Sequence, residues 1–347
     1  MVHSVALNAS PMRAVVVRET GGSFHGVDLP RPEPGPGEVL VRIHASGVNP
    51  LDAKIRAGAA PHARQPFPAI LGMDLAGVVE STGPFATRFQ PGDEVYGLTG
   101  GVAGLQGSLA EYAAVDADLL ALKPKALSMH AAAALPLVCI TAWEGLVDRA
   151  RTGAGDRVLV HGGAGGVGHV TVQLAKALGA KVFATVLPEQ ASIVRAYGAT
   201  PIDYASTTVD EYVDLHTGGE GFDVVYDTVG GATLDASFVA ARSYGGHVVS
   251  CLGWGTHALA PLSFRAATYS GVFTLIPLLT GKGRANHGRI LREITALVEA
   301  GKLRPRLDPG RYDLDSVEAA HRAVTGGTSR GKVVVDVRPP RALHGET

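Results

Sequence analysis

Cysteine is scarce in this sequence, which contains only Cys139 and Cys251 among its 347 residues. Two thiols exclude the disulfide framework of small secreted domains, and they exclude a structural zinc site built from cysteines. Both cysteines lie within apolar runs. We therefore expect them to be buried and reduced.

Charge and long apolar runs are scarce as well. Charged residues make up 18% of the chain and the net charge is −1, which argues against a protein that binds nucleic acid or a membrane surface through bulk charge. No uncharged apolar stretch is long enough to span a bilayer, and the start of the chain lacks the basic and apolar regions of a secretory signal. We expect a cytoplasmic protein in which residues 1–11 form a disordered extension.

The clearest feature that the sequence does contain is a glycine-rich stretch within residues 157–186. The apolar run Val158–Val160 fits a buried strand, and after the glycines apolar residues recur at helical spacing up to Leu178. Gly179 ends this helix, and a second apolar run follows at Val182–Val186. The stretch predicts a strand, a turn, a helix and a parallel strand, joined by a right-handed crossover.

The glycines of this turn predict a phosphate-binding loop. Gly162, Gly165 and Gly168 stand three residues apart. Glycine allows a sharp turn, a close approach of a pyrophosphate to the backbone, and tight packing of the helix on the sheet. The free N–H groups and the dipole at the start of the helix also favour a phosphate. We interpret the turn as a dinucleotide site, the alternative being a glycine-rich packing turn; its predicted cofactor-binding residues are Gly162, Gly165, Gly166, Val167 and Gly168.

The end of the second strand bears on the choice between NAD and NADP. Enzymes that use NAD usually place Asp or Glu about 20 residues past the glycines, where it binds the ribose 2′-hydroxyl. Here the strand ends at Thr185 and Val186, and no acid follows until Glu189. The missing carboxylate permits a 2′-phosphate, although the first basic residue is Arg195. We expect NADP(H), with NAD as the alternative, and we expect Thr185 in the cofactor site.

The remaining patterns predict a chain of two domains. From Met12, short β-rich runs alternate with turns, which predicts a β-rich or barrel-like unit. Beyond the glycine-rich stretch, helices alternate with strands, which is typical of an α/β fold with a doubly wound parallel sheet. A terminal strand near 331–337 can return to the first domain. We expect the β-rich domain at residues 12–136 and 282–347, and the dinucleotide domain at residues 137–281.

Four stretches of sequence carry a resemblance to a known family: GVNPLDAKIRAG at 47–58, LGMDLAGVV at 71–79, FQPGDEVYG at 89–97 and HGGAGGVG at 161–168. From Met12 to Val337 the chain resembles the medium-chain dehydrogenase/reductase superfamily, and within it the quinone oxidoreductase (ζ-crystallin-like) branch. The resemblance implies a GroES-like catalytic domain and a Rossmann domain, with the substrate in the cleft between them.

The resemblance also allows a test for catalytic zinc. Zinc alcohol dehydrogenases of this superfamily carry Cys and His at the positions that match Asn49 and Pro50, and Gly-His-Glu where this chain has Gly-Met-Asp at 72–74. Their third ligand, a cysteine, falls near Leu137, two positions from Cys139. A catalytic zinc needs three protein ligands, so we expect none here.

Without a metal to polarise an alcohol, the resemblance implies hydride transfer from NADPH to a quinone or an α,β-unsaturated carbonyl. Similar enzymes place the residues matching Asn49 and Asp52 beside the nicotinamide, where Asn49 binds either the substrate oxygen or the cofactor amide. Lys54 stands where this branch usually has a tyrosine. It either stabilises a developing enolate or quinol oxygen, or lies solvated on the surface. The proton that completes the reaction would come from water or from Lys54.

Two further residues match cofactor contacts in similar proteins, and a third is placed near the cofactor by its position after a strand. Thr141 faces the nicotinamide in those proteins, the alternative being a helix hydroxyl that bonds back to a carbonyl. Tyr204 lies near the adenosine phosphate there, or is a half-buried strand residue here. Gly253 follows a strand and is expected at the carboxyl edge of the sheet. We interpret His161 as a packing residue and expect the other histidines at the surface.

Other functions remain open at this stage. An enoyl-thioester reductase would need a long acyl channel, and a non-catalytic protein related to lens ζ-crystallin would keep NADPH binding alone. The apolar run Val272–Leu279 either extends the sheet or pairs between subunits. The resemblance implies a homodimer joined through this run. The expected partner is a small quinone or enone, with no nucleic acid and no membrane.

Overall fold

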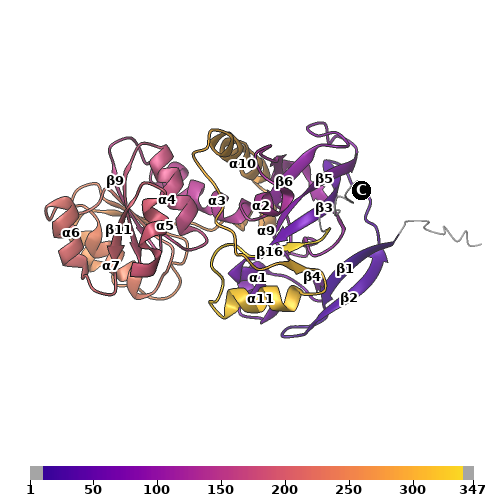
Figure 1. Cartoon of the computed structure of the whole chain (residues 1–347), viewed down its shortest axis with the longest axis horizontal. Coiled ribbons are helices and arrows are strands. Elements are labelled where there is room, and N and C mark those ends of the chain that lie inside the picture. The colour runs from indigo at the N-terminus through magenta and orange to yellow at the C-terminus, as the bar shows by residue number, and fades with distance from the viewer. Residues whose placement is uncertain (1–10, 339–347) are drawn as a thin grey trace, which may run out of the picture. The chain divides into compact units, whose positions relative to one another are not determined.

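The computed structural model describes residues 11–338, and these form two compact units (Figure 1). Unit 1 comprises the described residues of Met1–Leu137, Leu275–Thr295 and Leu307–Thr347. Unit 2 comprises Val138–Thr274 and Ala296–Arg306. The predicted extension at residues 1–11 lies outside the described residues except for Pro11, which begins the first strand.

Unit 2 is built on a six-stranded sheet in which every neighbouring pair of strands is parallel. The order β11-β10-β9-β12-β13-β14 places the first strand of the unit in the middle, so the chain winds outward in both directions from β9. Ligands of such sheets bind outside the carboxyl ends of the strands, where the order reverses. The strands are β9 (Arg157–His161), β10 (Lys181–Val186), β11 (Thr200–Asp203), β12 (Val224–Asp227), β13 (His247–Ser250) and β14 (Thr268–Gly271).

Helices connect these strands and bury their apolar faces on the sheet. The α4 helix packs on β9 and β10, and α7 packs on β12 and β13. Phe222, Phe238 and Leu234 form part of the apolar core between the helices and the sheet. The helices of this unit are α3 (Pro136–Trp143, beginning in unit 1), α4 (Gly168–Ala177), α5 (Ala191–Arg195), α6 (Val209–Thr217), α7 (Ala232–Ala240) and α8 (Ala260–Phe264), with a short 3₁₀ turn at Pro188–Gln190.

A π-helical turn at Glu144–Arg149 follows α3. Gly145 lies against the ring of Tyr226, so close that a Cβ at this position would overlap the ring. The Tyr226 hydroxyl donates a 2.6 Å hydrogen bond to the carbonyl of Thr141. Glycine in the π turn therefore admits a large buried side chain from the middle of β12.

Unit 1 is built on antiparallel β-structure that the C-terminal part of the chain completes. Its seven-stranded sheet has the order β15-β16-β3-β5-β6-β8, with β7 also paired to β3, and a second sheet has the order β2-β1-β4. The late strand β16 lies antiparallel to β3. The strands are β1 (Pro11–Val17), β2 (Phe24–Pro30), β3 (Glu38–Gly47), β4 (Ala69–Ile70), β5 (Asp74–Thr82), β6 (Glu94–Leu98), β7 (Tyr112–Asp116), β8 (Leu120–Leu122), β15 (Tyr312–Asp313) and β16 (Val334–Asp336).

Five α-helices accompany the sheets of unit 1. Most of them are short, and α10 is an amphipathic helix whose Ile290, Leu291 and Ile294 are buried. The helices are α1 (Pro50–Arg56), α2 (Met129–Ala133), α9 (Ile276–Thr280), α10 (Arg284–Glu299, ending in unit 2) and α11 (Val317–Thr325), with 3₁₀ turns at Pro61–Ala63 and Ala117–Leu119. Between residues 11 and 338, no helix is long and apolar enough to cross a bilayer.

The predicted α/β class with a doubly wound parallel sheet and a β-rich second part is confirmed. Of the two alternatives for Val272–Leu279, extension of the sheet is wrong. The last strand of the sheet is β14, and Ile276–Thr280 form a helix instead. Pro277 stands in the first turn of that helix, where its missing N–H costs nothing, whereas in a strand it would remove a ladder hydrogen bond.

The units also divide the chain differently from the predicted boundary near 282. Unit 1 resumes at Leu275, and the stretch Ala296–Arg306 belongs to unit 2. Hydrogen bonds between Gln173 on α4 and the backbone of Arg304 hold this stretch to unit 2. A contact between residues so far apart in sequence leaves no pattern in either segment.

Two expectations about single side chains are also wrong. His169, His287 and His321 are buried, although we expected histidines other than His161 at the surface. An imidazole packs much as an aromatic ring does, and the ring of His321 lies edge-on to that of Phe24 at 4.7 Å. Both cysteines are free thiols, but only Cys139 is fully buried, and Cys251 is partly exposed.

Candidate functional site

The turn from β9 into α4 leaves no room for side chains at three glycines. Gly162 has a φ of +70°, and a Cβ there would lie 2.9 Å from the hydroxyl of Thr228. A Cβ at Gly163 would lie 2.5 Å from the Cβ of Ala184, and one at Gly168 would overlap the carbonyl oxygen of Gly162. The helix therefore starts directly against the end of the strand. Its first N–H groups border a bare backbone concavity that fits a pyrophosphate.

Gly163 is a functional residue that the sequence analysis missed. Read from Gly163, the motif is Gly163-x-Gly165-x-x-Gly168, the usual G-x-G-x-x-G dinucleotide fingerprint, and Gly162 is the extra glycine that turns the chain out of β9. The signal was present in the sequence. To choose the first glycine of the motif, one must know where the strand ends, and the structure places that end at His161.

Thr185 lies at the carboxyl end of β10, as predicted, but its polar atoms brace the glycine turn. Its hydroxyl accepts a 3.1 Å hydrogen bond from the N–H of Gly162, and its carbonyl accepts one of 3.1 Å from the N–H of Gly163. The Nδ1 atom of His161 lies 3.2 Å from the same hydroxyl. Burial lowers the pKa of His161 to about 4, partly offset by the charge of Asp227, so this imidazole is neutral at pH 7.

Asp227 ends β12 at the same sheet edge and was also missed. Its carboxylate accepts 3.0 Å hydrogen bonds from the backbone N–H groups of Val229 and Gly230, and one of 2.6 Å from the hydroxyl of Ser250. The side chain is fully buried. It fixes the loop after β12 beside the dinucleotide turn and ties that loop to β13. An acid that follows the apolar run of a parallel strand is the signal that would have identified it.

The other predicted cofactor residues of unit 2 lie in different surroundings. Thr141 is buried on α3, where its carbonyl accepts the Tyr226 hydrogen bond. Tyr204 lies just beyond β11 and is 53% exposed, so it is not a half-buried strand residue. Gly253 is exposed after β13, and a Cβ there would overlap the hydroxyl of Tyr269. Gly253 thus marks another close backbone approach at the carboxyl edge of the sheet.

Unit 1 holds a buried cluster of charged and polar side chains around Asn49. The Asn49 Nδ2 donates a 2.9 Å hydrogen bond to the Asp74 carboxylate, and the Nζ of Lys332 donates to the Asn49 Oδ1 and, at 3.1 Å, to the carbonyl of Val48. The second oxygen of Asp74 accepts a 2.9 Å hydrogen bond from the N–H of Leu137. Lys332 lies two residues before strand β16, so the C-terminal part of the chain supplies the cation of this cluster.

Asp52 joins this cluster from the first turn of α1. One of its oxygens accepts a 2.8 Å hydrogen bond from the N–H of Asn49, the residue before the helix, and Pro50 occupies the first helical position. Asn49 and Asp52 therefore lie in one cluster. Lys54 lies two residues further along α1 and is exposed.

Burial dominates the acidity of the two carboxyl groups. Burial raises the pKa of Asp52 to about 7, with hydrogen bonding to the Asn49 backbone opposing it and the charge of Asp74 adding to it. Burial likewise raises the pKa of Asp74 to about 6, and the charge of Lys332 opposes this increase. Both groups are fully buried, so the cluster combines two costly carboxylates with one compensating ammonium.

Comparison with known proteins identifies the family. Residues 35–125 match the alcohol dehydrogenase GroES-like domain, and residues 197–335 match the zinc-binding dehydrogenase model. The chain is 37% identical to the 2-methylene-furan-3-one reductase of Solanum lycopersicum over 312 residues, which cover 87% of this chain and 72% of the relative. The chain belongs to the medium-chain dehydrogenase/reductase superfamily. The predicted resemblance is confirmed.

Further relatives indicate the branch of this superfamily. The chloroplastic NADPH-dependent alkenal/one oxidoreductase of Arabidopsis thaliana is 36% identical over 313 residues, covering 88% of this chain and 73% of that protein. A crystal structure of an alcohol dehydrogenase superfamily protein from Novosphingobium aromaticivorans shares 59% identity with a TM-score of 0.92, covering 94% of this chain and 100% of that one. Among medium-chain dehydrogenases and reductases, the chain thus falls in the quinone and alkenal oxidoreductase branch.

The residues at the expected metal position of this dehydrogenase do not fit a catalytic zinc. Asn49 offers an amide oxygen where zinc enzymes have a thiolate, and that oxygen already accepts a hydrogen bond from the ammonium of Lys332. A cation fixed at this point repels a divalent metal. Within residues 11–338, no three His, Cys, Asp or Glu side chains are grouped to hold a metal ion.

The raised pKa values of two carboxyl groups in unit 1 make the stability of this dehydrogenase depend on pH. Folded Asp52 and Asp74 bind protons more tightly than they do in the unfolded chain, where carboxyl pKa values are near 4. Their contribution to stability is therefore fully present below about pH 4 and is lost as the pH rises to about 7. We expect Asp52→Asn to reduce this loss by about 2 kcal/mol or more, measured by denaturant unfolding at a series of pH values.

Asp118→Asn is the matched control. It also removes one carboxylate from unit 1, but that carboxylate is 46% exposed and pairs with Arg88 on the surface. The control should change the pH profile of stability little. A profile of Asp52→Asn that is parallel to the unaltered protein's would show that Asp52 is ionised with an ordinary pKa.

Proposed function

We propose that this chain is a zinc-independent, NADPH-dependent oxidoreductase that transfers a hydride to a quinone or to the C=C bond of an α,β-unsaturated carbonyl. The observation that carries the proposal is the hydrogen bond from Lys332 to the Asn49 side chain at the expected metal position. A metal-free site has no Lewis acid to activate an alcohol. An acceptor that is already electron-poor needs none.

The names of the relatives support this acceptor class. One relative is named a reductase of a 2-methylene-furan-3-one, whose exocyclic C=C bond is conjugated with a ketone, and another is named an NADPH-dependent alkenal/one oxidoreductase. The quinone oxidoreductase of Coxiella burnetii, a structural neighbour, is 28% identical with a TM-score of 0.77. Quinones and enones share one property: each accepts a hydride while negative charge develops on a carbonyl oxygen.

The residues of unit 2 fit a dinucleotide. The bare backbone at Gly162, Gly163 and Gly168 gives a pyrophosphate access to the N–H groups at the start of α4. The neutral His161 adds no charge to this concavity, and Thr185 holds its shape. When bound, NADPH supplies the hydride. Thr141, Tyr204 and Gly253 are the further cofactor contacts that we propose, together with Gly165, Gly166 and Val167 of the loop.

A preference for NADPH over NADH follows from the end of β10. Val186 closes the strand, and the first carboxylate after it, Glu189, is exposed in a 3₁₀ turn. No carboxylate within the strand end binds the ribose 2′-hydroxyl or repels a 2′-phosphate. The exposed Tyr204 beyond the neighbouring strand β11 offers a hydroxyl to the adenosine side.

In unit 1 we propose that Asn49 and Asp52 act through the rigidity of their cluster. One Asn49 N–H and its oxygen are bound to Asp74 and Lys332. The remaining N–H of the amide is held in a fixed direction, as a hydrogen-bond donor for a substrate oxygen must be. Asp52 fixes the backbone of Asn49 from the first turn of α1.

The activity is tested by following NADPH absorbance with a simple quinone and a short enone in parallel, each repeated with NADH and after chelator treatment. We expect turnover that prefers NADPH and survives the chelator, because no step needs a metal. An enoyl-thioester serves as a third acceptor. Loss of activity on chelation together with stoichiometric zinc in the purified protein would overturn the zinc-free site.

The same assay separates catalysis from binding alone. Tight NADPH binding with no oxidation by any acceptor would indicate a non-catalytic, ζ-crystallin-like role. Turnover with the enoyl-thioester alone would redirect the proposal to acyl substrates. The faster of the quinone and the enone defines the acceptor class.

We propose that the Lys54 ammonium stabilises the negative charge that develops on the substrate oxygen, or that it donates the proton that completes the reduction. Its ammonium is exposed on α1, two residues from the buried Asp52, so it can exchange protons with water. We expect Lys54→Met to lower kcat with an enone about tenfold or more, and Lys54→Arg to retain most of the charge stabilisation. Steady-state rates with both variants at saturating NADPH test this. Equal rates for Lys54→Met and the unaltered enzyme would assign the proton to water.

We also propose that the enzyme is a cytoplasmic homodimer. Two free thiols, one of them partly exposed, suit a reducing compartment. At the end of the unit 2 sheet, β14 pairs only with β13 among the described strands, and two copies would pair through the Val272–Leu279 run that follows it. Light scattering should give about twice the 35.8 kDa mass of one chain. A monomer would overturn this assembly.

A further inference from the structure

Arg306 is the last residue of unit 2 in the sequence, and its side chain contacts the glycine-rich loop. Its Nη1 donates a 2.7 Å hydrogen bond to the carbonyl of Ala164, in the middle of the glycine-rich loop. The side chain is half-buried, and no acidic side chain among the described residues forms an ion pair with it. A guanidinium without a carboxylate partner thus lies against the loop that would carry the cofactor's phosphates.

His169 makes a second connection between the same two segments. Its Nε2 accepts a 3.2 Å hydrogen bond from the backbone N–H of Arg306, and its Nδ1 lies 3.0 Å from the carbonyl of Gly165. A carbonyl can only accept, so Nδ1 carries the proton and Nε2 carries the lone pair. The neutral imidazole therefore bridges the backbone of Arg306 and the loop, and it is buried on α4.

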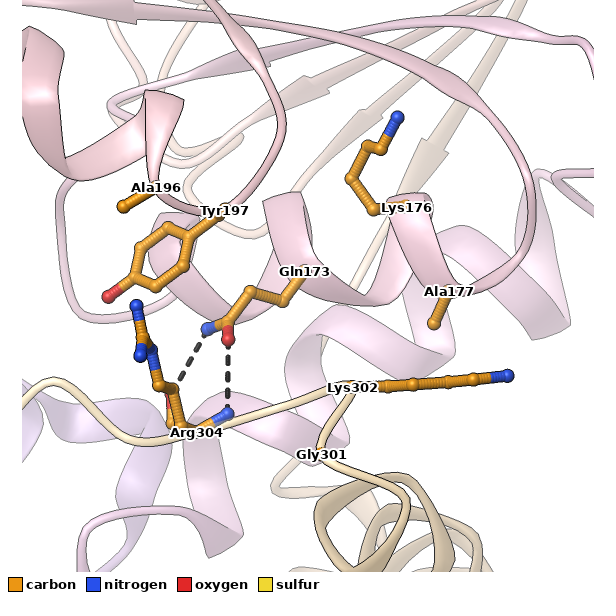
Figure 2. Close-up of a pocket in the computed structure, with 8 residues that line it drawn as sticks. All are labelled: Gln173, Lys176, Ala177, Ala196, Tyr197, Gly301, Lys302 and Arg304. Carbon is orange, nitrogen blue, oxygen red and sulfur yellow. Dashed lines mark hydrogen bonds between the residues drawn. The ribbon is translucent and has the colours of Figure 1, made fainter.

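Gln173 fastens the rest of the returning stretch one turn further along α4. Its Nε2 donates to the carbonyls of His169, at 2.9 Å, and Arg304, at 3.0 Å, and its Oε1 accepts a 3.0 Å hydrogen bond from the N–H of Arg304. Figure 2 shows the two bonds between Gln173 and Arg304. The Arg304 side chain itself turns to Tyr197, with its guanidinium carbon 5.6 Å from the ring centre. These residues also line a pocket of about 430 Å³ that includes none of the predicted site residues.

We propose that Arg306 is a positioning residue for the cofactor: together with His169 it holds the glycine-rich loop in the conformation that binds the pyrophosphate. The inference rests on the proposed dinucleotide site. A loop of glycines is costly to order, because glycine loses more conformational freedom than any other residue. Two bonds to the loop carbonyls, one from a charged donor, remove that freedom before the cofactor arrives.

Nucleotide titrations monitored by fluorescence test this. Arg306→Met should raise the dissociation constants of NADPH and NADH by the same factor, on the order of tenfold, because the pyrophosphate is common to both. Arg306→Lys, which can still donate to Ala164, should recover most of the loss. His169→Asn keeps a donor near Gly165 but cannot reach Arg306, and should weaken both nucleotides several-fold. In turnover, the KM for NADPH should rise while kcat and the KM for the acceptor stay nearly constant.

Arg304→Met is the matched control. It removes the same charge at a position two residues from Arg306, and the Arg304 side chain does not touch the loop. It should leave both dissociation constants within about twofold. Thermal melts confirm that each variant is folded. Unchanged affinity in both Arg306→Met and His169→Asn would overturn the inference, as would a loss confined to NADPH, which would make Arg306 a reader of the 2′-phosphate. An equal loss in the Arg304 control would also overturn it. If the unaltered protein binds neither nucleotide, the proposed function itself fails.

Discussion

The proposed cofactor site depends on one close contact, between the backbone at Gly168 and the carbonyl of Gly162, where no side-chain atom fits. Because of this contact α4 begins directly against the end of β9, and its first N–H groups face the carboxyl edge of the sheet. Neighbouring strands reinforce the arrangement: Thr185 from β10 binds the turn, and Asp227 from β12 fixes the next loop. The parallel sheet therefore acts as a frame that shapes a phosphate site from backbone atoms, and side chains contribute mainly by holding those atoms in place.

Unit 1 meets a different physical constraint, which is to hold two buried carboxyl groups within one cluster. Two buried carboxyl groups would repel each other and would resist ionisation, and the ammonium of Lys332 offsets part of that cost. The result is an Asn49 side chain whose orientation is set by bonds to both a carboxylate and a cation. A zinc ion would fix its ligands by coordination. Here the neutral Asn49 amide is fixed instead by hydrogen bonds to two oppositely charged partners, the Asp74 carboxylate and the Lys332 ammonium.

The fold class and the glycine turn between β9 and α4 could be predicted because they depend on local patterns: apolar periodicity, glycine spacing and turn residues. The family followed from four stretches of sequence that resemble it. It also held signals that were missed. Asn49 followed by Pro50 and Asp52 is a helix start, and Gly163 begins the G-x-G-x-x-G motif. Other features leave no local trace. Neither the partnership of Lys332 with Asn49 nor the bond from Arg306 to Ala164 can be read from a single sequence, since each joins segments over 100 residues apart.

These two long-range contacts have a common form. In each unit, a cation from the last part of the chain binds an oxygen in a site whose other residues come from earlier segments. The strands and turns of the early segments are held by backbone pairing and apolar contacts, and in unit 1 this pairing includes the late strand β16. The fixed orientation of Asn49 and the restrained glycine loop cannot exist until Lys332 and Arg306 have been placed. Catalytic geometry therefore requires the C-terminal third of the chain to have folded, even though the recognisable motifs all lie before it.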